Sequence, residues 1–385
     1  MPRDFRLLLV STFVTTGSFG LLLPIVPLWA LAGGASTTGA GATNATFLLV
    51  TVAAQVVSPA VLRAIGHRES LFAGGLLLGL PTFAYAITSD LGPLVAVSAV
   101  RGLGFALVVV TGITLVARLL PAERRGRGFG LYGMAVGLPN LVFLPAGPWI
   151  AEHLSFQALF VTGGVLPLAG VVLVAAMRVR TRQGPVRPAR TQRAGLPPLR
   201  SFTVPAVVMC AHAIGSSTIV TFLPAALPGG ATVAAALFAY SAGTVIGRWT
   251  AGILRDRRRR PVVLGPAAVA CAVGQLALGF AAYSEEQGLV AAAGVPGALI
   301  FGLGFGAVQT DTLTVMFDRI PARGYDLAST AWNMAFDSGT GIGSLVIGVL
   351  ATAFDFPTAF TLAAALLALL VPVAVALSRS RTRAG

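Results

Sequence analysis

The chain has 385 residues, of which 56% are hydrophobic and only 10% are charged, and its formal net charge is +14. A soluble globular chain carries about 25% charged residues, so this chain has too few charges to cover a surface that faces water. The composition therefore excludes an ordinary soluble protein and indicates a surface covered mostly by lipid.

All 27 basic residues are arginine. A strongly basic chain first suggests nucleic-acid binding, but here the arginines lie in short segments between apolar stretches. We therefore expect no nucleic-acid partner. Cys210 and Cys271 each lie inside an apolar stretch, and no Cys or His spacing suggests a disulfide framework or a metal site. We expect no metal and no cofactor.

A bilayer core of ~30 Å requires ~20 apolar residues per helix. Because backbone polar groups cannot stay unpaired in lipid, each such segment must be helical. Twelve segments meet the requirement, at residues 5–31, 40–62, 70–89, 92–118, 127–151, 156–178, 202–227, 231–254, 261–283, 288–317, 326–352 and 356–378. The first is too long for the apolar part of a signal peptide, so we expect it to remain as a span.

The arginines predict the orientation of these spans. They cluster at both termini and in every second connection, whereas the other connections contain none. Those connections instead carry Asp90, Glu152, Glu285, Glu286 and Asp355. Arginine-rich connections remain in the cytoplasm. We therefore predict an all-α, multi-pass protein of the plasma (inner) membrane, with twelve transmembrane helices and both termini cytoplasmic.

A repeat divides the chain. Residues 101–140 and 301–340 are identical at ten of forty positions without a gap, including the run GLGF and a Pro-Ala turn. The repeat predicts two parallel-related halves of six helices, residues 1–180 and 201–385, with a substrate site at their interface. The linker at 181–200 is rich in Arg and Pro, and we expect it to lie in the cytoplasm and attract anionic lipid headgroups.

Several loops contain family motifs. Gly252 to Arg260 reads GILRDRRRR, which resembles the G-x-L-x-D-R-x-x-R-R loop of the major facilitator superfamily. A weaker copy at 59–68 has Arg63 in place of the Asp. The RGLG run from Arg101 and the ERRGR run at 123–127 resemble two further motifs of the family.

Within this superfamily the chain is most similar to the small efflux permeases of the drug:proton antiporter type. Gly147-Pro148 resembles their fifth-span motif, although Phe143 stands where that motif has Gly. The resemblance implies a monomeric carrier that moves a small molecule by alternating access, coupled to protons, with membrane lipid around it.

Ionisable groups inside the membrane are costly and mark candidate functional sites. Asp337 lies about eleven residues into its segment, roughly 17 Å deep at 1.5 Å per residue. Asn333 is one helical turn away on the same face, and Trp332 is adjacent. We predict a substrate or proton site here. The alternative is a hydrogen bond between helices that only holds the bundle together.

Four further residues are candidates for substrate binding or proton coupling. Asp311, preceded by Gln309, lies ~9 Å from the inner end of its segment, where it could reach inner water or an arginine. Arg101 has no deep acid in its own half, so we predict that it contacts substrate or responds to protonation. His212 could titrate, and the alternative is a hydrogen-bonded packing residue.

The inner loops suggest a gate. An acid on the cytoplasmic side can pair with basic groups of the other half when the inner mouth is closed, which would bias a two-state equilibrium. The alternative is a basic turn that only sets topology. The candidates are Asp256, Arg257, Arg260, Arg63, Arg124, Arg125 and Arg127.

The glycine runs at 302–306 and 339–343 lie inside spans, so we expect close helix packing rather than nucleotide binding. The leading prediction is a secondary transporter that exports a small apolar or amphipathic molecule by proton antiport. The alternative is a proton-coupled or facilitative uptake carrier. An enzyme would need clustered catalytic groups, and a channel would not need two matched halves, so we expect neither.

Overall fold

The computed structural model describes residues 1–178, 200–258, 263–284, 286–319 and 325–379. Every regular element in these ranges is helical. The elements are α1 (Arg3–Leu22), α2 (Ile25–Ala32), α3 (Thr37–Ile65), α4 (His67–Gly79), η1 (Leu80–Ala86), α5 (Leu91–Leu119), α6 (Ala122–His153), α7 (Phe156–Ala175), α8 (Arg200–Ser217), η2 (Thr218–Phe222), α9 (Leu223–Ala226), α10 (Gly230–Arg258), α11 (Leu264–Tyr283), α12 (Gln287–Asp318), α13 (Tyr325–Ala353) and α14 (Phe356–Arg379).

Within the described ranges, eleven helical segments are long and apolar enough to cross a membrane. This confirms the multi-pass membrane class. The predicted span at 70–89 is not among the eleven, because α4 ends at Gly79 and the chain continues as the 3₁₀ segment η1. Pro81 near the start of η1 lacks the N–H that the α-helical bonding pattern requires. Within the described residues, the twelve predicted spans thus correspond to eleven long helical segments and the α4–η1 segment, which changes from α-helix to 3₁₀ helix.

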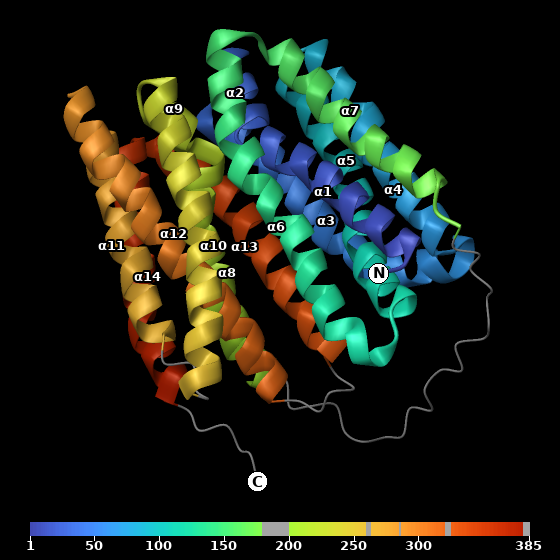
Figure 1. Cartoon of the computed structure of the whole chain (residues 1–385). Helices are drawn as coiled ribbons and strands as arrows, with labels where there is room; N and C mark the ends of the chain where they lie inside the picture. The colour runs from blue at the N-terminus through green and yellow to red at the C-terminus, as the bar shows by residue number, and fades with distance from the viewer. Residues whose placement is uncertain (179–199, 259–262, 285, 320–324, 380–385) are drawn as a thin grey trace.

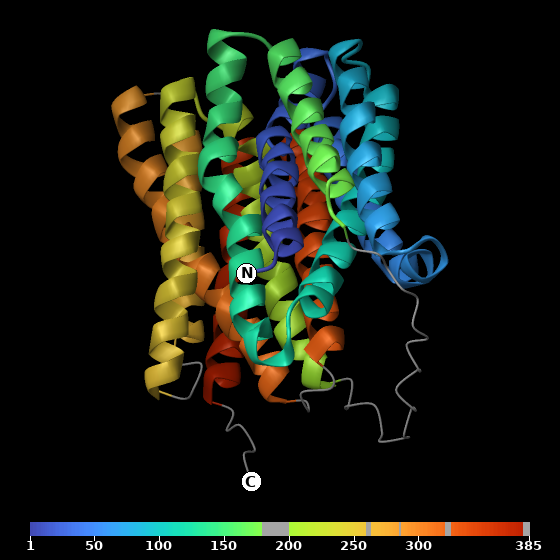
Figure 2. The ribbon, with the colours of Figure 1, turned by 45° about the vertical axis from the view of Figure 1, so that its right-hand side comes forward.

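We call α1–α7 the N-terminal set and α8–α14 the C-terminal set, and we name the ends of the molecule inner and outer after the predicted orientation. Contacts between the sets run mainly along α3 with α13 and along α6 with α10. Figure 1 shows α1, α3, α4 and α7 slanting away from α10, α11 and α14 toward the lower, inner end, and Figure 2 gives a second view. The boundaries at 180 and 201 remain predictions, since 179–199 lie outside the described residues.

The two sets are tightly joined near the outer end. Thr37 Oγ1 donates to the Gly348 carbonyl oxygen at 3.1 Å, and the Thr38 N–H donates to Thr352 Oγ1 at 3.0 Å. A Cβ added to Gly348 would lie 2.6 Å from the Thr37 carbonyl oxygen. The backbones of α3 and α13 therefore approach closely because Gly348 has no side chain, as is common between membrane helices.

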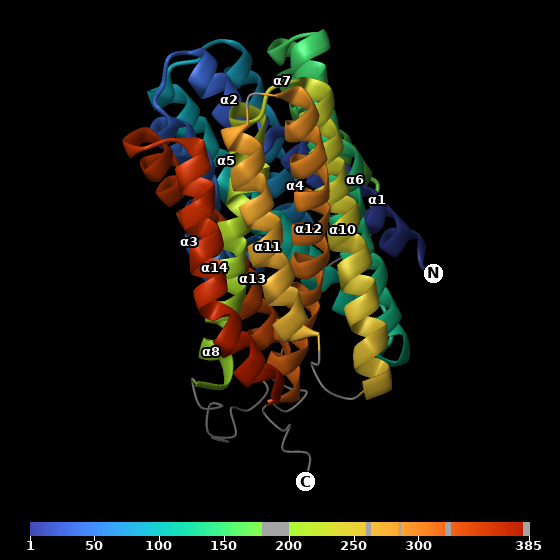
Figure 3. The ribbon, with the colours of Figure 1, turned by 90° about the vertical axis from the view of Figure 1, so that its left-hand side faces the viewer.

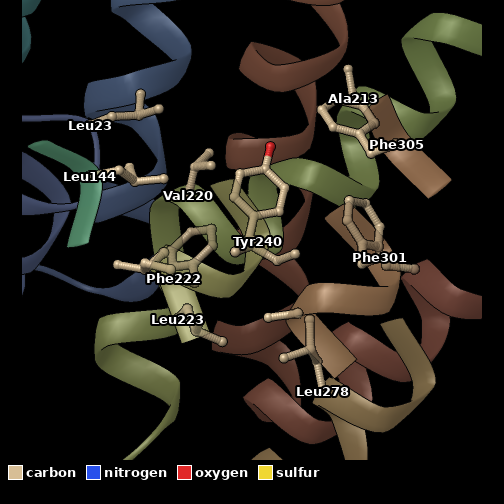
Figure 4. Close-up of a cluster of buried hydrophobic side chains, with 14 of the residues drawn as sticks. Leu23, Leu144, Ala213, Val220, Phe222, Leu223, Tyr240, Leu278, Phe301 and Phe305 are labelled. Carbon is tan, nitrogen blue, oxygen red and sulfur yellow. The ribbon is translucent and has the colours of Figure 1, made fainter. Parts of the chain in front are cut away.

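The largest hydrophobic cluster lies mostly in the C-terminal set and extends to the other set. Figure 4 shows Tyr240, Phe301 and Phe305 packed together, with Leu23 and Leu144 of the N-terminal set approaching from the side of Phe222. Figure 3 shows α11 and α14 on the face of the C-terminal set that is turned away from the N-terminal set. The core is therefore continuous across the interface between the sets.

The repeated GLGF runs occupy equivalent places in the two sets. A Cβ on Gly102 would overlap the Phe47 carbonyl oxygen of α3, and one on Gly302 would overlap the Tyr240 carbonyl oxygen of α10. The expectation that these glycines pack helices is met. The same contacts make Phe47 and Tyr240 equivalent positions, which relates α3 to α10 residue by residue.

Candidate functional site

Asp337 lies on the interface between the two sets. It is 7% exposed, and its Oδ2 accepts a hydrogen bond of 2.9 Å from Gln55 Nε2 of α3. Gln55 is ten residues from the inner end of α3, or about 15 Å. Between described residues, no hydrogen bond or ion pair joins the sets nearer the inner end than this one. Among the described residues, Asp337 thus marks the inner limit of bonded contact between the sets.

The predicted neighbours of Asp337 bond elsewhere. Asn333 Nδ2 donates to the Ser329 carbonyl oxygen of its own helix at 2.8 Å. Trp332 Nε1 donates to Thr312 Oγ1 of α12 at 3.0 Å, and its ring stacks on Phe336 with centroids 6.0 Å apart. These two side chains therefore line the inner part of α13 beside Asp337 without bonding to its carboxylate.

Asp311 is fully buried in α12 and lies apart from the interface bond. Its Oδ1 is 3.8 Å from Arg255 Nη1, and Arg255 also pairs with Asp318 at the inner end of α12. All three residues belong to the C-terminal set, so this cluster ties α10 to α12. An arginine does reach Asp311, as the sequence suggested, but it comes from the adjacent helix of the same set.

Arg101 is 4% exposed inside the N-terminal set. Its guanidinium carbon lies 5.4 Å from the ring centres of both Phe47 and Tyr85, and its Nε donates to the Leu78 carbonyl oxygen at 3.4 Å. Aromatic faces and a carbonyl are favourable partners for a buried cation. No carboxylate of the described residues lies within ion-pair distance of it.

Arg101 borders a small cavity of about 10 Å³, which has room for about one water molecule. Asn44, which also borders this cavity, donates to Thr221 Oγ1 of the C-terminal set at 3.1 Å. The cavity therefore lies between the buried arginine and a further polar link between the sets.

His212 is fully buried in α8, and its Nδ1 lies 2.7 Å from the Val208 carbonyl oxygen. A bond to the preceding turn of its own helix satisfies one ring nitrogen. This position is compatible with the packing alternative, and it does not bring His212 to the bond between Asp337 and Gln55.

The gate candidates divide into described and undescribed groups. Arg63, Arg124, Arg127 and Arg257 are exposed, and no ion pair joins them to any described residue. The side chains of Asp256 and Arg125, and the whole of Arg260, lie outside the described part of the chain.

His67 lies at the same inner end of the molecule. Its burial, followed by the charge of Arg118, lowers its pKa. The lowered pKa favours the neutral form of this histidine beside the arginines around it.

Arg248 was missed by the sequence analysis. It lies inside the apolar segment 231–254, ten residues before the end of α10, and its Nε donates to Gln309 Oε1 of α12. A Cβ added to Gly137 of α6 would lie 3.4 Å from Arg248 Nη1. A single arginine within an apolar segment was the available signal. The arginine-rich loop that follows α10 drew attention away from this arginine, so it was counted with the basic residues of the loop region and not as a site candidate.

Comparison with known proteins agrees with this architecture. The chloramphenicol resistance protein of Streptomyces lividans is 26% identical over 368 residues, covering 90% of each chain. The riboflavin transporter RibZ of Clostridioides difficile (strain 630) is 22% identical over 109 residues, which are 28% of this chain and 24% of its own.

Solved structures share the fold at lower identity. A mutant of the nucleoside transporter NupG superposes with a TM-score of 0.74 at 12% identity, covering 97% of this chain and 99% of that one. The peptide transporter POT in complex with sulfate gives 0.74 at 15% identity, covering 98% and 96%. A family profile described as Major Facilitator Superfamily matches residues 8–342 and, in a second alignment, residues 206–385. This chain, a multi-pass membrane protein of the transporter type, belongs to the Major Facilitator Superfamily.

Proposed function

We propose that this protein is a secondary active transporter that exports a small apolar or amphipathic molecule in exchange for protons by alternating access. The observation that carries the proposal is the bond from Gln55 to the buried carboxylate of Asp337 across the two helix sets. A hydrogen bond to an ionised acceptor is stronger than one to a neutral acceptor. Protonation of Asp337 would weaken this bond and so change the balance between states of the two sets.

The same proposal assigns the sides of the membrane. The arginine-rich connections predict cytoplasmic termini in the plasma membrane. Bonded contacts lie toward the outer end, from Thr37 and Gly348 to Gln55 and Asp337, which supports an inward-facing state. In this scheme the proposed halves, residues 1–180 and 201–385, move against each other around the site.

The direction of transport is proposed from sequence similarity. The relative named for chloramphenicol resistance, aligned over 90% of each chain, favours export of a drug-like molecule. Uptake is the second candidate, because a shorter match is named a riboflavin transporter without a direction of transport. Arg101 and Asn44, at the small cavity beside a link between the sets, are proposed to sense substrate or the state of the interface.

The test is transport by purified protein in liposomes with a pH-sensitive dye inside. Chloramphenicol is the first compound, followed by any compound to which expressing cells gain resistance in a growth panel. Substrate added on one side should drive protons the opposite way. Asp337→Asn should lose proton-driven accumulation by at least about tenfold and keep exchange of labelled for unlabelled substrate.

Thr162→Val is the control, because Thr162 is an exposed residue of α7, which packs against α1 and α4, and its hydroxyl donates within its own helix. It should keep both activities. Proton flux in the same direction as the substrate would support uptake instead, and unchanged proton coupling in Asp337→Asn would refute the role of this carboxylate.

A further inference from the structure

The two interfaces between the helix sets differ in the charge of their side chains at equivalent places. Because Phe47 is equivalent to Tyr240, counting eight residues along each helix pairs Gln55 with Arg248. The sequence repeat likewise pairs Asp337 with Gly137. One interface thus holds Gln55 against Asp337, and the other holds Arg248 beside Gly137. Where the first interface has the amide of Gln55, the second has a cation, and where the first has a carboxylate, the second has no side chain.

Among the described residues, no hydrogen bond or ion pair involves the terminal nitrogens of the Arg248 guanidinium. Its Nε is held by Gln309 Oε1, and Gln309 is buried, so the planar group has a fixed orientation. Within the described residues no carboxylate lies within 4 Å of it. The side chain is nevertheless exposed, although it lies about 15 Å from the inner end of α10.

The exposed edge faces the space between the sets. Ser241, two turns away on the same face of α10, donates to the Asn140 carbonyl oxygen of α6 at 3.2 Å. Nη1 of Arg248 lies close to Gly137, one turn from Asn140 on α6. Nearer the outer end this face of α10 is therefore bonded to α6, and at Arg248 it meets a glycine and open space.

We propose that Arg248 binds a carboxylate group of the transported molecule in the space beside Gly137, so that the substrate is an amphipathic monocarboxylate. This inference rests on the proposed function, because it assigns a substrate class to that transporter. A guanidinium offers a planar pair of N–H donors that matches a carboxylate. An arginine inside the membrane requires such a partner or water, and the substrate supplies the carboxylate that Asp337 supplies at the equivalent place.

The test is binding of two near-isosteric probes, 4-phenylbutyrate and 4-phenylbutyramide, to purified full-length protein at pH 7.5 by calorimetry. A panel of other monocarboxylates with their amides follows in the same format. Wild-type protein should bind at least one carboxylate about tenfold or more tightly than its amide. Arg248→Gln should lose this preference, since one charge-assisted pair is worth about a factor of ten or more.

Two variants at Gly137 separate charge from size. A Cβ there makes only an ordinary contact with Arg248, so both variants should fold. Gly137→Asp places a carboxylate beside Arg248 and should abolish carboxylate binding. Gly137→Asn has the same size without the charge, and it should weaken carboxylate binding by occupying part of the space without abolishing it. Equal loss in both variants, binding to Arg248→Gln at wild-type strength, or no carboxylate preference across the whole panel would each overturn the inference.

Failure of this inference can be distinguished from failure of the proposed function. If carboxylate binding depends on Arg248 but no proton flux occurs in liposomes, proton antiport is overturned and the carboxylate site at Arg248 stands. If only neutral compounds are exported with proton coupling, and Arg248→Gln does not affect this export, the carboxylate site is overturned and the proposed proton antiport stands.

Discussion

At the residue scale, two deep arginines are accommodated in different ways. Arg101 lies between the rings of Phe47 and Tyr85, where each desolvated cation–π contact is worth about 0.5–2 kcal/mol. Arg248 is held by one neutral amide and remains exposed. The enclosed arginine is suited to hold the N-terminal set in one arrangement, whereas the exposed one is suited to meet a ligand.

Arg101→Ala should reduce the initial rate of transport in liposomes by at least about tenfold. The change removes the cation from between two rings and leaves Tyr85 without its charged neighbour. Arg101→Lys keeps the charge without the planar group, and we expect an intermediate rate. Size-exclusion profiles of both variants serve as the folding control. Wild-type transport by Arg101→Ala would remove this residue from the mechanism.

At the element scale, proline and glycine determine how the helices bend and how closely they approach. The first helical segment breaks at Leu23-Pro24, between α1 and α2. The repeated segment breaks around Leu223-Pro224, where the π-helical turn η2 leads into α9. Both breaks follow from the missing N–H of proline. Phe143, which departs from the antiporter motif, fits because Gly17 of α1 lies opposite its ring.

The outer contact between α3 and α13 depends on Gly348. A leucine there should push α13 away from the Thr37 carbonyl oxygen and favour an outward-open state. The measurement is labelling of Ser344→Cys by a membrane-impermeant maleimide added outside, in protein whose Cys210 and Cys271 are replaced by Ser. Ser344 is fully buried at this interface, so labelling should be slow without the leucine and several-fold faster with it.

Gly133→Leu is the control for this change, because a Cβ at Gly133 meets nothing within 4 Å. It should leave the labelling rate of Ser344→Cys as it was. If Gly348→Leu also leaves that rate unchanged, the outer contact does not control access.

At the scale of the whole molecule, the contacts between described residues support the proposed inward-facing state, which is one of the two states that alternating access requires. The sets are joined from the outer end as far as Gln55 and Asp337, and beyond that level no bond between described residues joins them. A carrier of this kind needs a second state with the inner end closed. The gate proposed for Asp256 and the arginines of the inner loops belongs to that second state.

Asp256→Asn should shift the balance toward the inward-facing state. Removing an acid that pairs only when the inner end is closed destabilises the closed form, by up to about 1.4 kcal/mol or a tenfold change in populations. External labelling of Ser344→Cys should then become slower. Glu69→Gln, an exposed acid at the inner end of the N-terminal set, is the control. An unchanged rate in Asp256→Asn would exclude the gate.

The candidate site was only partly predictable from the sequence. A lone acid in an apolar segment identified Asp337 and Asp311, since burial of an ionisable group is costly wherever it occurs along a helix. Their partners were not predictable. Gln55 is 282 positions from Asp337, and Arg255 reaches Asp311 from a neighbouring helix. Hydropathy describes the surroundings of one helix and carries no information on which side chains face it.

The sequence by itself determined the membrane class, the places of the apolar segments and the repeat, because these follow from composition, segment length and the cost of unpaired backbone groups in lipid. Only the tertiary structure decided that Asp337 bonds across the interface, that Asp311 bonds within its own set, and that Arg248 faces Gly137. Those pairings depend on how helices distant in the chain approach one another, and that approach is set by glycine contacts between backbones.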